Sequence, residues 1–208
     1  EWNDMGTDAT LLTNYLDKDI NGQTWHYPSQ AECESCHTTV AGFTLGPEIG
    51  QLNRTLLYPG PNSTGFEANQ LITLEDIAVL PLLTTEQKST SFYAIDNTVY
   101  SSERRARSYL HSNCANCHQP GGPGGGNMDL RFSTLLANMN ICYQPPLGDT
   151  LGLTNPRIIN PGNPDLSILV LRMEDTGQNR MPPLASAEVD TYAMGVIRDW
   201  ITNLTSCK

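Results

Sequence analysis

The chain has 208 residues and a net charge of −10 at pH 7. This acidity argues against nucleic acid as a partner, which would require a basic patch, and favours basic partners. Only 38% of the residues are hydrophobic, and 14 prolines with 17 glycines indicate much loop. A core built from side chains alone would therefore be thin, and something besides side chains is expected to fill the interior.

No apolar run approaches the roughly 20 residues of a membrane span, so none is expected. The first ten residues lack the charged and apolar regions of a signal peptide. If the protein is exported, we expect this sequence to be its mature form, with the signal already removed.

The first half contains short predicted elements. Asn21 and Gly22 form a turn that could close a β-hairpin. A short helix should start after Pro28 and continue into Cys33. Residues 42–53 are predicted to be a loop followed by a helical turn, and the pattern at 71–80 indicates a helix ended by the next residue, a proline.

The second half is richer in helical patterns. Residues 101–113 form a predicted helix, capped by Ser101 or Ser102, with Ala106, Tyr109 and Leu110 on its apolar face. Three further segments have predicted structures: a glycine-rich loop at 119–127, a turn and then a helix at 160–173 with Pro164 near its first position, and an amphipathic helix at 186–204.

One short motif occurs twice, 81 positions apart. Two thiols at i and i+3 project from the same side of a helical turn and can form thioethers with the two vinyl groups of a haem. The histidine that follows can then bind the iron, which is the signature of c-type haem attachment. The motif residues are Cys33, Cys36 and His37 in the first copy and Cys114, Cys117 and His118 in the second.

The motifs have two other interpretations. The four cysteines could form a zinc site, but this leaves both flanking histidines unexplained. A thioredoxin-like redox pair would need a βαβ context that the sequence does not show. Two covalently bound haem c groups explain all six motif residues, and they would also fill the thin core.

Met181 is the expected sixth ligand of the second haem iron, since methionine is common at that position in electron-transfer cytochromes. It lies in a polar, proline-rich segment, "NRMPPL", directly before the last predicted helix. The alternative, that Met181 is core filler, fits this setting poorly.

The order of these elements in residues 101–208 resembles a class I cytochrome c domain, in which the first and last helices pack together. "WHYPSQAECESCH", "GFTLGPEIGQLNR", "RARSYLHSNCANCHQPGGP" and "MPPL" together resemble a family of exported bacterial di-haem c-type cytochromes. The resemblance and the spacing of the motifs together predict a mainly α fold with extensive loops, made of two cytochrome c-type haem domains at 1–98 and 99–208. The Asn21-Gly22 turn adds a possible short β-hairpin near the N-terminus.

The sixth ligand of the first haem is left open. No methionine lies between His37 and Met128. His26 is one candidate, because Pro28 could turn the chain over the far face of the haem. The others are His111, Met5, Met128, Met173 or an open site.

The remaining cysteines are Cys142 and Cys207. Because exported proteins form disulfides readily, the two are expected to be joined, with a pair of free thiols as the alternative.

The sequence therefore predicts an electron-transfer protein of the periplasm or the cell exterior that passes single electrons between redox protein donors and acceptors. Two alternatives stay open. One is a di-haem peroxidase-like enzyme with one open iron site. The other is a subunit that self-assembles into an electron-conducting polymer or docks on a dehydrogenase.

Overall fold

The computed structural model describes residues 1–60, 64–184 and 186–207. Across these ranges, no helix combines enough length with enough apolar surface to span a membrane. The elements, in chain order, are β1 (Leu16–Ile20), β2 (Gln23–Tyr27), α1 (Gln30–Glu34), α2 (Ile49–Leu52), β3 (Thr55–Tyr58), β4 (Phe66–Asn69), α3 (Gln70–Asp76), α4 (Thr85–Ser89), α5 (Ser102–Cys114), η2 (Leu136–Asn138), η3 (Pro164–Leu166), α6 (Ile168–Glu174) and α7 (Thr191–Asn203).

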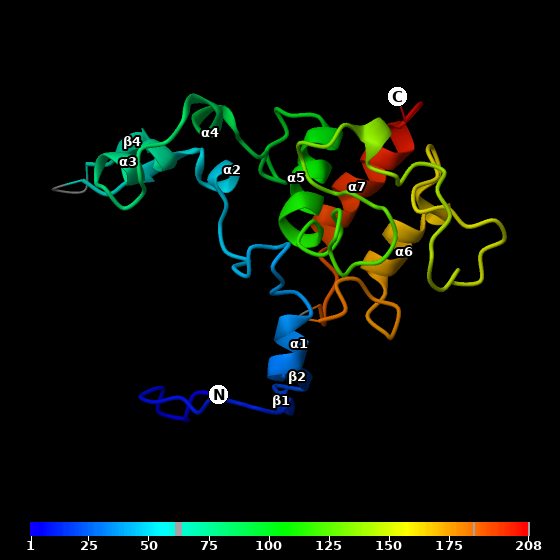
Figure 1. The fold of residues 1–208 in the computed structure, drawn as a ribbon, viewed down its shortest axis with the longest axis horizontal. Coiled ribbons are helices and arrows are strands. Elements are labelled where there is room, and N and C mark those ends of the chain that lie inside the picture. Colours follow the sequence, from blue (N-terminus) through cyan, green and yellow to red (C-terminus); the bar gives the residue numbers. More distant parts are fainter. Residues whose placement is uncertain (61–63, 185, 208) are drawn as a thin grey trace.

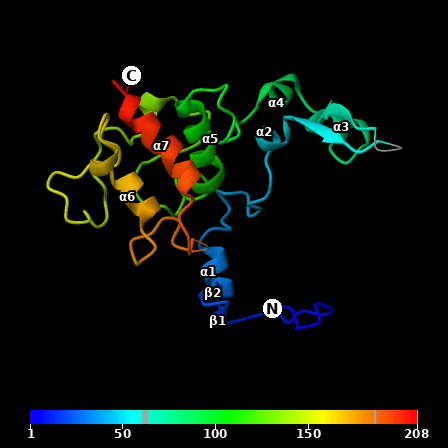
Figure 2. The same ribbon diagram turned by 180° about the vertical axis from the view of Figure 1, so that it is seen from behind.

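The apolar core forms where α5 packs against α7 (Figures 1 and 2). Ala106 and Leu110 lie one helical turn apart on α5, and both are fully buried. Ile197 and Trp200 of α7 belong to the same cluster. The packing of these two helices agrees with the expectation from the sequence.

Two charge interactions fix α7 against its neighbours. Arg198 donates hydrogen bonds to both carboxylate oxygens of Glu174 on α6, each 2.7 Å long. The same guanidinium bonds Asp165 of η3 at 2.6 Å. The planar guanidinium suits this two-sided arrangement, which holds α6 and η3 along one side of α7.

The first half has almost no core of its own. Among its described residues, Leu71 and Leu83 are the only buried apolar side chains. Figure 1 shows the N-terminal segment and the α3 region projecting away from the α5–α7 core in different directions. The expected division at residue 98/99 stays a prediction.

Each sheet is a single antiparallel hairpin. β1 pairs with β2 so that Ile20 lies opposite Gln23, and the turn residues Asn21 and Gly22 both have positive φ. This is the twist that a two-residue hairpin loop requires, and it confirms the turn expected there. The second hairpin, β3 with β4, was not predicted.

The expected fold class is wrong. A mainly α chain of two cytochrome c-type haem domains was expected, but the structure is 30% helical and 12% strand, with two small antiparallel sheets and seven short α-helices in its described part, and no cytochrome-like fold. The physical reason is that a Cys-x-x-Cys-His motif specifies one turn of backbone and not the fold around it.

Three helix boundaries also differ from expectation. The last helix begins at Thr191 rather than at 186, because the Asp190 carboxylate accepts a hydrogen bond from the Ala193 N–H and caps it there. The 71–80 pattern forms a helix only to Asp76. Pro164 starts the short η3 helix, and α6 follows it as a separate helix.

Candidate functional site

The first motif lies at the end of α1. Ser29 and Glu32 form a reciprocal capping box that starts this helix. Helical winding continues past the helix end, because the N–H groups of Cys36 and His37 both donate to the Cys33 carbonyl, at 3.1 and 3.0 Å. The thiols of Cys33 and Cys36 are free.

The second motif repeats this backbone pattern at the end of α5. The N–H groups of Cys117 and His118 both donate to the Cys114 carbonyl, at 3.1 and 2.8 Å. Both thiols are free here too. Two segments far apart in the chain, preceded by unrelated sequences, thus adopt the same local structure around the same residues.

The tertiary structure brings the two motifs together. Cys36 of the first motif lies near enough to Cys117 of the second to raise the pKa of that thiol. The loops after the two motifs are also neighbours: a Cβ on Gly121 would lie at van der Waals distance, 3.6 Å, from Val40 Cγ2. Burial, followed by the nearby Cys36, raises the pKa of Cys117 to about 11. Burial also raises the pKa of Cys114 to about 12, so both thiols are protonated at neutral pH.

The two motif histidines differ in how their rings are held. His37 Nδ1 lies 2.6 Å from the Phe43 carbonyl oxygen, so Nδ1 carries the proton and Nε2 is left as a basic nitrogen. His118 Nδ1 is buried and has no hydrogen-bond partner. Burial lowers the pKa of His118, which favours the neutral imidazole that binds a metal.

This donor set fits covalently attached haem. Each motif offers two free thiols on one helical turn and an imidazole whose Nε2 makes no described hydrogen bond. By contrast, no group of three or more histidine, cysteine or acidic side chains in the described part of the chain could hold a metal ion. The four-cysteine zinc site is therefore not assembled.

His26 lies against the helix of the first motif. Its Nε2 is 3.2 Å from Glu32 Oε1, and its Nδ1 is 2.6 Å from Asp17 Oδ1. The ring also stacks on Tyr15, with centroids 5.6 Å apart. The hydrogen bond with Asp17 is the main cause that raises the pKa of His26. Iron ligation by Nε2 would require it to leave Glu32, while Asp17 could keep orienting the ring.

His111 has no free ring nitrogen in this structure. Its Nδ1 accepts a hydrogen bond of 3.0 Å from the Phe132 N–H, so Nε2 carries the proton and donates to Glu48 at 2.9 Å. The Phe92 ring meets the imidazole edge-on at 4.5 Å between centroids. These contacts make His111 part of the junction between the two halves, and iron ligation by it would likewise require a ring nitrogen to leave its partner.

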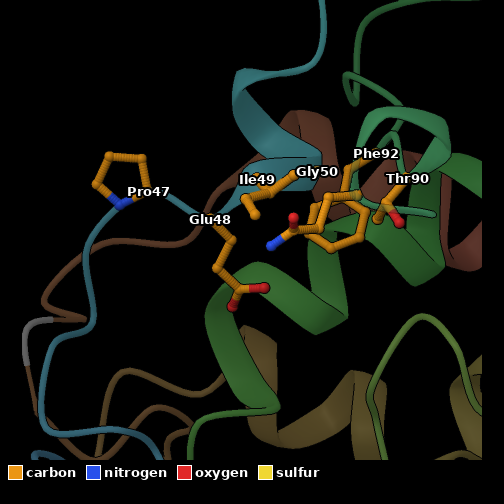
Figure 3. A pocket seen from close by; sticks show the side chains of 7 residues that line it. Pro47, Glu48, Ile49, Gly50, Thr90 and Phe92 are labelled. Carbon is orange, nitrogen blue, oxygen red and sulfur yellow. The ribbon is translucent and has the colours of Figure 1, made fainter. Parts of the chain in front are cut away.

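The Glu48–His111 junction borders a hollow of about 500 Å³ that the sequence did not predict (Figure 3). The Phe92 ring stands against Gly50, where a Cβ would lie 2.8 Å from the ring, and the Phe92 N–H donates to the Gly50 carbonyl at 2.8 Å. The only sequence signal for this contact was the glycine in an otherwise helical turn. The hollow is lined by Pro47, Glu48, Ile49, Gly50, Gln87, Thr90 and Phe92.

The structure places the methionine candidates in different surroundings. The Met181 N–H donates to the Arg172 carbonyl at the end of α6, at 2.9 Å, and Met181 is not among the side chains packed on the core. Met128 and Met173 do pack on that core, whereas Met5 is 80% exposed. No described hydrogen bond or ring contact joins any of them to a motif histidine.

Cys142 and Cys207 form a disulfide with their Cα atoms 6.1 Å apart, in agreement with the expected pairing. Cys142 packs on the core, and its backbone forms an isolated parallel β-bridge with Ile159. The bond therefore ties the segment after α7 to the core.

Comparisons with models of known protein families, with curated proteins and with solved structures found no match for this chain.

Proposed function

We propose that the chain is a di-haem c-type electron carrier that works outside the cytoplasm and passes single electrons between redox proteins. The observation that supports this most is the pair of motifs with the same backbone geometry, which lie near enough for Cys36 to raise the pKa of Cys117. Attachment at neighbouring positions suits transfer between two redox groups within one small protein.

In this proposal Cys33 and Cys36 hold one haem, Cys114 and Cys117 hold the other, and the iron ligands are His37 and His118. Each haem supplies reversible one-electron chemistry when bound. The turns after Cys33 and Cys114 keep each thiol pair and its histidine in fixed relation. Cys114 packs partly buried against the core, which would limit access of water to the attachment edge.

The proposed sixth ligands are Met181 at the second haem and His26 at the first. A thioether favours ferrous iron relative to imidazole, so the second haem should have the higher potential. His26 lies beside the first motif helix through Glu32, which supports the assignment of this histidine to the first haem.

A redox titration followed by visible absorption tests the function. Two one-electron components are expected in the wild type, and Cys114→Ser with Cys117→Ser should leave one. The matched variant, Cys33→Ser with Cys36→Ser, should leave the other. Absence of any component in the wild type would refute the proposed function.

A subunit of an electron-conducting assembly is the second candidate. It is favoured by large apolar side chains that the thin first half leaves exposed, among them Trp2, Leu11 and Trp25. Such surfaces mark contact sites when they gather. A higher apparent size on a sizing column at high than at low protein concentration would support the assembly, and an unchanged monomer would exclude it.

A further inference from the structure

The glycine-rich loop at 121–126 folds back over the second motif. The Gly124 N–H donates to the Cys117 carbonyl at 3.0 Å, and the Leu130 N–H donates to the His118 carbonyl at 2.9 Å. A Cβ on Gly124 would lie 2.5 Å from His118 Nδ1 and 2.7 Å from its Cε1. Gly124 does not have a left-handed φ, so glycine is needed here because of close approach to the imidazole and to the Cys117 carbonyl oxygen, 2.8 Å from such a Cβ.

Gly124 covers one edge of the His118 ring. Nδ1 lies on this edge, where it is buried and has no partner, whereas Nε2 is not among the buried unpartnered atoms. An orphaned buried polar atom is uncommon in folded proteins and calls for a reason. Here the glycine backbone excludes water from Nδ1 without offering it an acceptor, and Nε2 is the nitrogen left for a metal.

The first motif holds its histidine in the opposite way. The Phe43 carbonyl accepts from His37 Nδ1 at 2.6 Å. A tight turn aims this carbonyl: the Phe43 N–H donates to the Thr38 carbonyl at 2.9 Å, and Gly42 and Phe43 both have positive φ. A left-handed phenylalanine is rare and costs energy, which indicates that the carbonyl direction matters.

These two arrangements have different consequences for a bound metal. An imidazole that donates its Nδ1–H to a carbonyl is a more basic ligand than one without an acceptor. A more basic ligand stabilises the oxidised iron and lowers its reduction potential, since hydrogen bonding around the ligand is one of the protein's means of tuning that potential.

We propose that Gly124 is a positioning residue for His118. Its backbone covers Nδ1 of the imidazole and offers this nitrogen no hydrogen-bond acceptor, and this gives the second haem a higher potential than the first. This inference rests on the proposed function. It assigns a role to the glycine loop and makes the two sites unequal through their proximal histidines, independently of their sixth ligands.

Gly124→Ala in the haem-loaded protein is the test. The new Cβ would clash with the His118 imidazole and with the Cys117 carbonyl oxygen, both in the second motif. The potential and the ferric spectrum of one haem should therefore shift while those of the other stay unchanged. Gly125→Ala is the matched control: it lies next in the same loop, has a φ of +68°, and its Cβ would meet no atom within 4 Å. It strains the backbone without touching His118 and should move neither potential.

Three results would overturn the inference: no shift in Gly124→Ala, an equal shift at both haems, or the same shift in Gly125→Ala.

If Gly124→Ala does not fold, proton NMR of the reduced wild type decides. The His37 Nδ1–H should resonate downfield of the His118 Nδ1–H, because only the former has an acceptor; equal shifts would contradict the inference. Lack of haem in the wild type would refute the proposed function instead, so the two failures are distinguishable.

Discussion

Removal of the Cys142–Cys207 disulfide should lower the stability of the folded chain substantially. Replacing Cys142 and Cys207 together by alanine opens a loop with a sequence separation of 65. The chain-entropy relation for a loop of this length gives about 4 kcal/mol at 25 °C. Because Cys142 packs on the core, the loss of its side-chain contacts adds to the entropic term. We therefore expect the free energy of unfolding to fall by at least about 4 kcal/mol.

Guanidinium unfolding followed by far-ultraviolet circular dichroism measures this loss. The variant should unfold at a lower denaturant concentration. Its free energy of unfolding should also fall more steeply with denaturant, because the unlinked unfolded chain exposes more surface. Thiol labelling of the unfolded, unreduced wild type provides the control and should find neither Cys142 nor Cys207 reactive. A loss below about 1 kcal/mol, which is less than disulfides of this span contribute, or two reactive thiols, would refute the reasoning.

Two further predictions concern the second half. Leu110→Ala should destabilise the protein by about 3 kcal/mol, since this fully buried side chain of α5 belongs to the core shared with α7. The control Leu82→Ala, at an 87% exposed position, should cost less than about 0.5 kcal/mol. Equal losses of stability in thermal unfolding would contradict the core described here. Hydrogen bonding from Arg131 is the main cause that lowers the pKa of Asp129 to about 2. This carboxylate should contribute roughly 2 kcal/mol above pH 4, lost as the pH falls toward 2; Asp129→Asn should remove that acid dependence in unfolding titrations, and an unchanged pH profile would refute it.

Local structure could be predicted where a few adjacent residues determine it. Ser101 caps α5 as expected, accepting from the Arg104 N–H at 3.4 Å, and the hairpin turn follows from two residues that tolerate positive φ. The second hairpin could not be predicted in this way. Thr55–Tyr58 shows no clear alternation of apolar and polar residues, and it becomes a strand only through pairing with Phe66–Asn69.

In the candidate site, too, the local features could be predicted and the contacts between distant segments could not. The motif residues could be identified from the sequence because thioether formation needs two cysteines at a fixed spacing. The proximity of Cys36 to Cys117 could not, since it depends on how the first half folds back onto α5. Nor does any sequence pattern predict that the Phe43 carbonyl meets His37. For Gly124, the glycine run was a signal of close backbone approach, but it did not identify the imidazole as the neighbour.

The expected fold class was wrong for a related reason. It placed a separate haem fold in each half, whereas the buried apolar residues concentrate between Ala106 and Ile201. The first half contributes short hairpins and helical turns around its motif, and it reaches the second half through contacts such as Glu48 with His111.

Intact mass spectrometry of the denatured, fully reduced protein tests the central claim most directly, because only covalent attachment survives unfolding. We predict a mass greater than that of the bare polypeptide by two haem groups. Serine at Cys114 and Cys117 should reduce the excess to one. A mass equal to that of the polypeptide alone would contradict haem attachment at both motifs and, with it, the proposed function.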